Sequence, residues 1–357
     1  MKKIFVLLMI LGIFFLTGCG KNNEDSAFKD LTNKINKLNS YTLNGTLEIK
    51  NNNNVNTYNV KVNFMKNDKF KVTLVNTSNN HEQVILRNDD GVFVLTPSLN
   101  KSFKFQSDWP YNNSQVYLLK SIIDDLNNDS NVVKTMIDDK YVFTSKVNYP
   151  NNSDLERQKV TVNQDLLIEK VEILNDKDEA EMTFTISSID YDPTFDESYF
   201  EVNSIINTQT PNQNDTSKDE KTEEGNQTGD TKTDTSQDTK TATLDDIVYP
   251  LYLPSGTVLE QQEKVTKTNG ERVILTFGGE KSFTLVEETA LKEDEMTIIP
   301  TYGEPSFVND TIGAITDNSL NWISNGIEYY IVSDVMSSDE LLNVAKSIDI
   351  KAVAATK

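Results

Sequence analysis

Few residues of this chain are of the types that carry out covalent or metal chemistry. Its 357 residues include one cysteine, Cys19, and one histidine, His81. One histidine without a cysteine beside it cannot form a zinc site of the usual kind or a Cys–His nucleophile pair. His81 lies in HEQVILR, a predicted strand, and we expect it on the surface of that strand. The sequence contains no Gly-rich phosphate loop and no HExxH, CxxC or GxSxG motif.

Carboxylates are abundant, with 55 Asp and Glu residues. Asp125, Asn127 and Asp129 have the oxygen spacing of a calcium loop. Ser130 stands where that loop needs glycine, and Met136 where it needs a bidentate glutamate, so we predict no calcium site. A glycosidase needs two carboxylates facing one cleft, and the sequence does not show which two would do so. We therefore predict a protein that is not an enzyme, with no catalytic residue, metal or cofactor.

The chemistry that the sequence does predict is at Cys19. Lys2 and Lys3 precede the apolar run IFVLLMILGIFFL, which leads into Leu16-Thr17-Gly18-Cys19. A basic start, a short apolar core and small residues before a cleavage point are typical of a secretory signal. Leucine, two small residues and cysteine resemble the bacterial lipobox, which implies cleavage before Cys19 and diacylglycerol on its sulfur. The alternative is an uncleaved membrane anchor.

The net charge of −21 excludes two classes of partner. Nucleic acid and anionic lipid surfaces both attract basic proteins and repel acidic ones. A lipid on Cys19, rather than a basic patch, is therefore expected to hold the protein to the membrane. We predict a signal peptide over residues 1–18, a lipidated tether over 19–25, and a position on the extracytoplasmic face of the cell membrane.

The stretch FKFQSDWPYNNSQVYLLKSIIDDL, residues 103–126, is the candidate functional segment. It begins as a strand, breaks at Trp109-Pro110, and restarts as a helix with Asn113 or Ser114 at the N-cap. So apolar a helix should lie across a sheet or plug its concave face as a lid. The aromatic group beside the proline either packs over the end of a barrel, guards an apolar cavity or forms a partner surface. The residues assigned to this lid, cavity or partner surface are Trp109, Pro110, Tyr111, Val116, Leu119, Ile123 and Leu126.

The elements around this segment alternate with period two, which is typical of strands. We predict a mainly β (α+β) protein with three parts. Residues 26–203 should form a half-open antiparallel β-barrel of about ten strands with two helices. Residues 204–242 should be a flexible, disordered linker, because residues 207–241 contain no large apolar side chain. Residues 243–357 should form a small α+β domain whose last helix begins at Ser337, with Glu340 at capping-box spacing.

The order helix, long meander, strand–Trp-Pro–helix insertion and closing meander resembles the LolA-like fold. That fold is a half-barrel with a helical lid, found in lipoprotein carriers and in RseB-type envelope-stress sensors. Residues 103–126 behind the LTGC lipobox are most similar to the GerS-type and YdcC-type spore lipoproteins. The C-terminal stretch with Leu253-Pro254-Ser255-Gly256 and Trp322 to Tyr330 resembles an uncharacterised domain appended to such lipoproteins.

The resemblance implies functions of two classes. GerS-type proteins bind a cell-wall amidase, which implies a membrane-anchored protein that binds a cell-wall enzyme in sporulation, germination or envelope assembly. The alternative is a carrier of acyl chains or lipoproteins, or an envelope-stress sensor module. Carriers shuttle in solution, whereas lipid on Cys19 would tether this chain, so we favour the first function.

The lipid anchor can be tested at Cys19. Removal of the acceptor sulfur in Cys19→Ala should leave the precursor unprocessed or release the protein from membranes. Membrane fractionation and metabolic labelling with a radioactive fatty acid measure this. Normal membrane retention of a Cys19→Ala chain that has lost its signal would contradict lipidation as the anchor.

Overall fold

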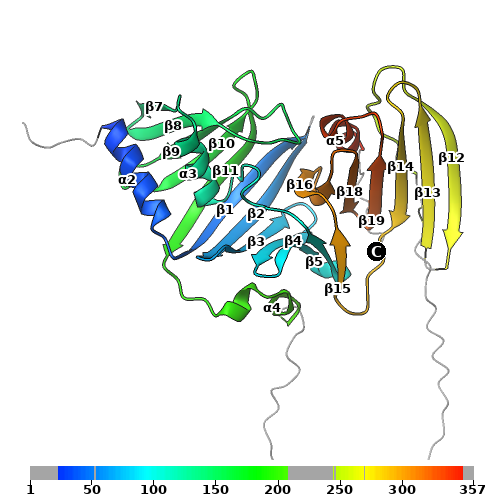
Figure 1. Ribbon diagram of the computed structural model, residues 1–357, viewed down its shortest axis with the longest axis horizontal. Coiled ribbons are helices and arrows are strands. Elements are labelled where there is room, and N and C mark those ends of the chain that lie inside the picture. The colour runs from blue at the N-terminus through cyan, green and yellow to red at the C-terminus, as the bar shows by residue number, and fades with distance from the viewer. Residues whose placement is uncertain (1–22, 52–53, 208–243, 245–246, 269, 349–357) are drawn as a thin grey trace, which may run out of the picture. The chain divides into compact units, whose positions relative to one another are not determined.

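The computed structural model describes residues 23–51, 54–207, 244, 247–268 and 270–348 (Figure 1). The predicted signal peptide, Cys19 and residues 208–243 of the predicted linker lie outside the described residues. The chain forms two compact units, one of residues 1–67 with 108–194 and one of residues 68–107 with 195–357. The predicted domain limits stay a prediction.

The first unit is an open antiparallel sheet with two helices. Its strand order is β2-β1-β11-β10-β9-β8-β7. The helices are α2 (Glu24–Asn36) and α3 (Leu119–Asn128), and both lie on one face of the sheet (Figure 1). The strands are β1 (Ser40–Asn51), β2 (Asn54–Met65), β7 (Val133–Ile137), β8 (Lys140–Lys146), β9 (Arg157–Val162), β10 (Ile168–Leu174) and β11 (Ala180–Tyr191).

A row of buried apolar side chains crosses this sheet from β8 to β2. Strand registers place its members directly opposite one another, since alternate residues of each strand face the same side. Phe28 of α2 meets the first of them, Phe143, edge to face, with ring centroids 5.4 Å apart. The helices therefore cover the apolar face. The row is Phe143, Val160, Val171, Phe184, Leu47 and Tyr58.

The second unit contains four strands from the first half of the chain. Strands β4 and β5 are buried at consecutive positions, because both of their faces are covered. The rings of Phe195 and Tyr199 stack, Phe200 packs edge to face against both, and Lys71 Nζ of β3 lies over the Tyr199 ring. The elements are β3 (Lys69–Asn76), β4 (Glu82–Asn88), β5 (Gly91–Thr96), η1 (Pro97–Leu99), β6 (Lys101–Phe105), η2 (Glu197–Phe200) and α4 (Val202–Asn207).

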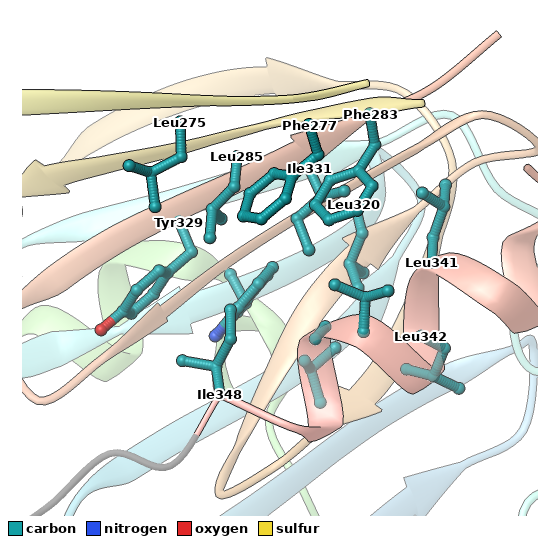
Figure 2. Close-up of a cluster of buried hydrophobic side chains, with 14 of the residues drawn as sticks. Leu275, Phe277, Phe283, Leu285, Leu320, Tyr329, Ile331, Leu341, Leu342 and Ile348 are labelled. Atoms are coloured by element: carbon teal, nitrogen blue, oxygen red, sulfur yellow. The ribbon is translucent and has the colours of Figure 1, made fainter. Parts of the chain in front are cut away.

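The rest of the second unit is a seven-stranded antiparallel sheet of order β12-β13-β14-β19-β18-β17-β16. Helix α5 (Ser338–Lys346) packs on it and contributes Leu341 and Leu342 to the apolar cluster in Figure 2, to which Leu320 and Phe283 also belong. Ser337 and Glu340 form the predicted capping box. Its strands are β12 (Val258–Lys267), β13 (Gly270–Gly278), β14 (Phe283–Thr289), β16 (Glu304–Val308), β17 (Thr311–Ile315), β18 (Ser319–Ser324) and β19 (Ile327–Val332). Strand β15 (Thr297–Thr301) is not part of this sheet and pairs with β6.

The predicted fold class is confirmed. The protein is mainly β, its sheets do not close into a barrel, and helices cover the open face. The predicted N-cap of the lid helix at Asn113 or Ser114 is wrong, because α3 begins at Leu119 with Leu118 at the N-cap.

Gly45 provides a test of the packing of the first sheet. A Cβ at this position would lie 2.6 Å from the Thr185 carbonyl oxygen and 2.7 Å from the Phe184 ring. Gly45→Ala should therefore lower the free energy of unfolding by about 1–3 kcal/mol, as overpacked cores do. Denaturant titration measures this. In Gly45→Ala/Phe184→Leu the smaller side chain makes room, so the loss should be smaller than the sum of the two single losses.

Candidate partner-binding site

The lid segment, defined here as residues 108–128, belongs to the first unit. It opens with a tight turn in which the Tyr111 N–H donates to the Asp108 carbonyl at 2.9 Å. The Trp109–Pro110 peptide bond is cis, and both residues are buried. Tyr111 is 46 % exposed, so it is the one predicted site residue with a large accessible surface.

Hydrogen bonds fasten the next part of the lid segment to the loop after β8. The Ser114 N–H donates to the Asn148 carbonyl at 2.8 Å, and the Asn148 N–H donates to Ser114 Oγ at 2.7 Å. The Asn148 amide also donates to the Asn112 carbonyl at 2.9 Å. Tyr117 donates its hydroxyl hydrogen to Gln115 Oε1 at 2.8 Å. These contacts explain why the helix starts late: the polar side chains that could cap it earlier are engaged elsewhere.

Helix α3 buries the remaining predicted residues. Leu119, Ile123 and Leu126 are on the helix and have no exposed surface. Val116 is equally buried but precedes the helix, so it is not part of the helical stripe that its spacing predicted. The Ile122 carbonyl accepts a hydrogen bond from the buried Gln158 side chain of β9 at 2.9 Å, which fixes α3 across the sheet.

One carboxyl group of α3 is electrostatically unusual. Burial raises the pKa of Asp125 to about 7; a hydrogen bond from the Ser114 hydroxyl partly opposes the rise, and the charge of Asp124 adds to it. Burial and the charge of Asp125 also hold the pKa of Tyr149 well above its ordinary value. The contact between the lid segment and the loop after β8 thus contains a group that titrates near neutral pH.

The sequence reasoning missed the exposed apolar residues of β7, which lies at the end of the strand order. Val133 is 53 % exposed and Ile137 51 %. On the opposite face of β7, Lys134 Nζ lies 2.8 Å from the Asp25 carboxylate and 4.4 Å from the centre of the Phe28 ring. The inward face is thus fixed to α2, and the outward face presents apolar side chains to solvent. The alternation of side-chain types in NVVKTMI, residues 131–137, is the sequence feature that could have predicted this exposed apolar face.

Six of the seven predicted residues are buried in the packing of the lid segment, and Tyr111 is exposed. Within the part of the chain that the structure describes, no group of three or more His, Cys, Asp and Glu residues is placed to hold a metal ion. None of the helices among the described residues has the length and hydropathy to cross a bilayer.

Comparison with known proteins gives the family. The family model described as "Sporulation protein YdcC-like" matches residues 1–200. The sporulation protein YdcC of Bacillus subtilis (strain 168) is 35 % identical over 351 residues, covering 97 % of each chain. The chain belongs to the YdcC-like family of sporulation proteins. The predicted resemblance to YdcC-type proteins is confirmed, and the similarity to YdcC includes the C-terminal half.

Solved structures resemble this YdcC-like protein more distantly. The complex of the CwlD amidase with the GerS lipoprotein from Clostridioides difficile matches at 17 % identity over 48 % of this chain and 95 % of that chain, with a TM-score of 0.29. A LolA superfamily protein from Nitrosomonas europaea matches at 11 % identity over 51 % of this chain and 99 % of that chain, with a TM-score of 0.31.

Titration of Asp125 predicts a pH dependence of stability. Its pKa is raised to about 7 in the folded state, so the protonated carboxyl stabilises the fold below its ordinary pKa, and this contribution is lost as the pH rises through about 7. Asp125→Asn should therefore have a higher Tm than the wild type at pH 8 and a flatter profile between pH 5 and 8. Thermal unfolding followed by circular dichroism measures both.

Asp129 provides the matched control for Asp125. Hydrogen bonds from the N–H groups of Lys146 and Asn131 lower the pKa of its carboxyl. Its stabilisation is present above the ordinary pKa and is lost on acidification. Asp129→Asn should therefore lower the Tm at neutral pH. An Asp125→Asn variant that lost stability at pH 8, as Asp129→Asn should, would contradict the assignment.

Proposed function

We propose that this YdcC-like protein is a lipid-anchored lipoprotein of the extracytoplasmic membrane face that acts in sporulation by binding a protein partner. The finer proposal is that the partner is a cell-wall enzyme of the amidase class and that the protein itself catalyses no reaction. Membership of a family of sporulation proteins and the lipobox before Cys19 support the setting.

The observation that carries the partner-binding role is the contrast between the closed lid and the exposed edge strand. Leu119, Ile123 and Leu126 have no exposed surface, so a ligand could enter beneath α3 only by displacing it. Burial of one leucine stabilises by about 1.5–3 kcal/mol, and a ligand would have to offset several such terms. Val133 and Ile137 of β7, by contrast, are accessible without rearrangement. An edge strand with apolar side chains is a surface to which a partner can add a strand.

The alternative function is an acyl-chain carrier or sensor module. It draws on the same lid, whose apolar residues would line a cavity if α3 moved away. Asp125, whose pKa is raised to about 7, contributes to the polar contacts of the lid segment. Its titration would make the movement of α3 pH-dependent. The two functions predict different effects of substitutions in the lid and on β7.

Substitutions on β7 should separate binding from stability. Val133→Glu/Ile137→Glu places charges on the outward face of β7 and should weaken partner binding at least tenfold, with little change in Tm. Lys61→Glu, at an exposed position of β2, is the matched control and should do neither. Biolayer interferometry against the purified cell-wall amidases of the same cell measures binding.

Leu119→Ala tests the lid in the same assays. Loss of a buried leucine side chain should lower the free energy of unfolding by about 2–5 kcal/mol, and partner binding of the folded protein should be retained. If Leu119→Ala were as stable as the wild type and altered the acyl chains found by mass spectrometry in purified protein, the carrier function would replace the one proposed.

A further inference from the structure

Strand β15 does not join the seven-stranded sheet that precedes and follows it in the chain. Residues 290–303 run out between β14 and β16, and Thr297–Thr301 pairs in parallel with β6 (Figure 1). Thr297 lies opposite Lys101, and Ile299 opposite Phe103. The seven strands of the C-terminal sheet pair with one another without β15. Strand β15 therefore extends the sheet of β3–β6 rather than the seven-stranded sheet.

Hydrogen bonds hold the chain at both ends of β15. At the start, the Thr297 N–H donates to the Asn100 carbonyl at 2.9 Å, and the Asn100 side-chain amide donates to the Glu293 carbonyl at 2.7 Å. At the end, the Ser107 hydroxyl donates to the Glu304 carboxylate. The start and end of β6 thus hold the segment that carries β15.

Between these polar contacts, the residues of β15 itself are only weakly packed. None of its five residues is buried, and Ile298 is 48 % exposed. Pro300 has no N–H to donate, which is a common feature of edge strands. The neighbouring strand β6 has well-buried residues, with Ser102 at 0 % and Phe105 at 4 % exposure. Segments with few buried apolar contacts open at a small free-energy cost, so β15 should detach far more readily than β6.

The seven-stranded sheet makes separate contacts with β4 that do not involve β15. Gln83 of β4 is 5 % exposed; its Nε2 donates to the Ile312 carbonyl at 3.2 Å, and its Oε1 accepts from the Ile312 N–H at 2.6 Å. The Thr311 hydroxyl donates to the same oxygen at 3.0 Å. Side chains of β17 and β18 also line a small cavity together with Phe103 and Phe105. Release of β15 would leave these contacts in place.

We propose that the outer edge of β6 is an exchangeable strand-binding site, filled by β15 at rest and open to an extended peptide in parallel register when β15 leaves. The ligand is an uncharged segment of the type Thr-Ile-Ile-Pro-Thr, with β-branched residues opposite Lys101 and Phe103. A protein partner would supply such a segment. The identity of that partner rests on the function proposed above, whereas peptide binding to β6 does not.

The experiment uses a fluorescent peptide of residues 296–303, which has no charged side chain, and the folded chain from residue 20 onward. In one variant, residues 297–301 are replaced by Gly-Ser-Gly-Ser-Gly, which empties the edge and leaves Gln83 intact. Fluorescence anisotropy should show saturable binding to this variant and at least tenfold weaker binding to the wild type. A peptide of reversed sequence has the same composition and should not bind. Failure of the folded variant to bind, or equal binding by the wild type, overturns the proposal.

A locked chain provides the second variant. Ser102 and Ile298 are direct partners in the β6–β15 register, so Ser102→Cys/Ile298→Cys should form a disulfide that holds β15 on the edge. Peptide binding should be absent when this chain is oxidised and return to the wild-type level on reduction. Hydrogen exchange on the wild type needs no substitution: β15 amides should exchange at least tenfold faster than those of β5. Equal protection of the two strands overturns the proposal even if the substituted chains fail to fold.

Discussion

The apolar row that crosses β8, β9, β10, β11, β1 and β2 is the feature on which the first unit depends. The sheet does not close on itself, so these side chains would face water unless other elements covered them. Helices α2 and α3 provide that cover, with Phe28 against Phe143 and four buried residues on α3. Because the apolar row must be covered from water, the lid segment stays packed against the sheet. The proposed binding of a partner at strand edges, rather than in an open cavity, follows from this packing.

An open sheet also has edge strands, and the two units differ in whether another strand covers the edge. Strand β7 ends the order at one side with Val133 and Ile137 exposed, whereas β6 is covered by β15. Unpaired N–H and C=O groups at an edge attract other strands, so proteins usually cover or charge them. In this chain the covering strand is itself barely buried. Under the two proposals, a partner would have to displace β15 to reach β6, whereas it could reach β7 without displacing a strand.

Buried polar side chains help to hold helix α3 and strand β17 in place. Gln158 donates to the Ile122 carbonyl and so fixes α3, and Gln83 pairs with the backbone of Ile312 in the same manner. Burial raises the pKa values of Asp125 and Glu287 to about 7, although the Val248 N–H donates to Glu287. A buried polar group is costly unless it finds a partner, so each of these side chains favours one arrangement over its alternatives.

The sequence by itself determined the strands with period two and the capping box at Ser337, because these depend on residues close together in the chain. The mainly β fold class followed from the number of such strands, whereas lipidation of Cys19 stays a prediction. The sequence did not predict that α3 begins at Leu119, since Ser114 bonds to Asn148 instead of capping a helix. Nor did it predict β15, whose Thr-Ile-Ile-Pro-Thr becomes a strand only where β6 offers an unpaired edge. Contacts between residues far apart in the chain decided both, and short-range patterns do not encode which distant surface will meet a segment.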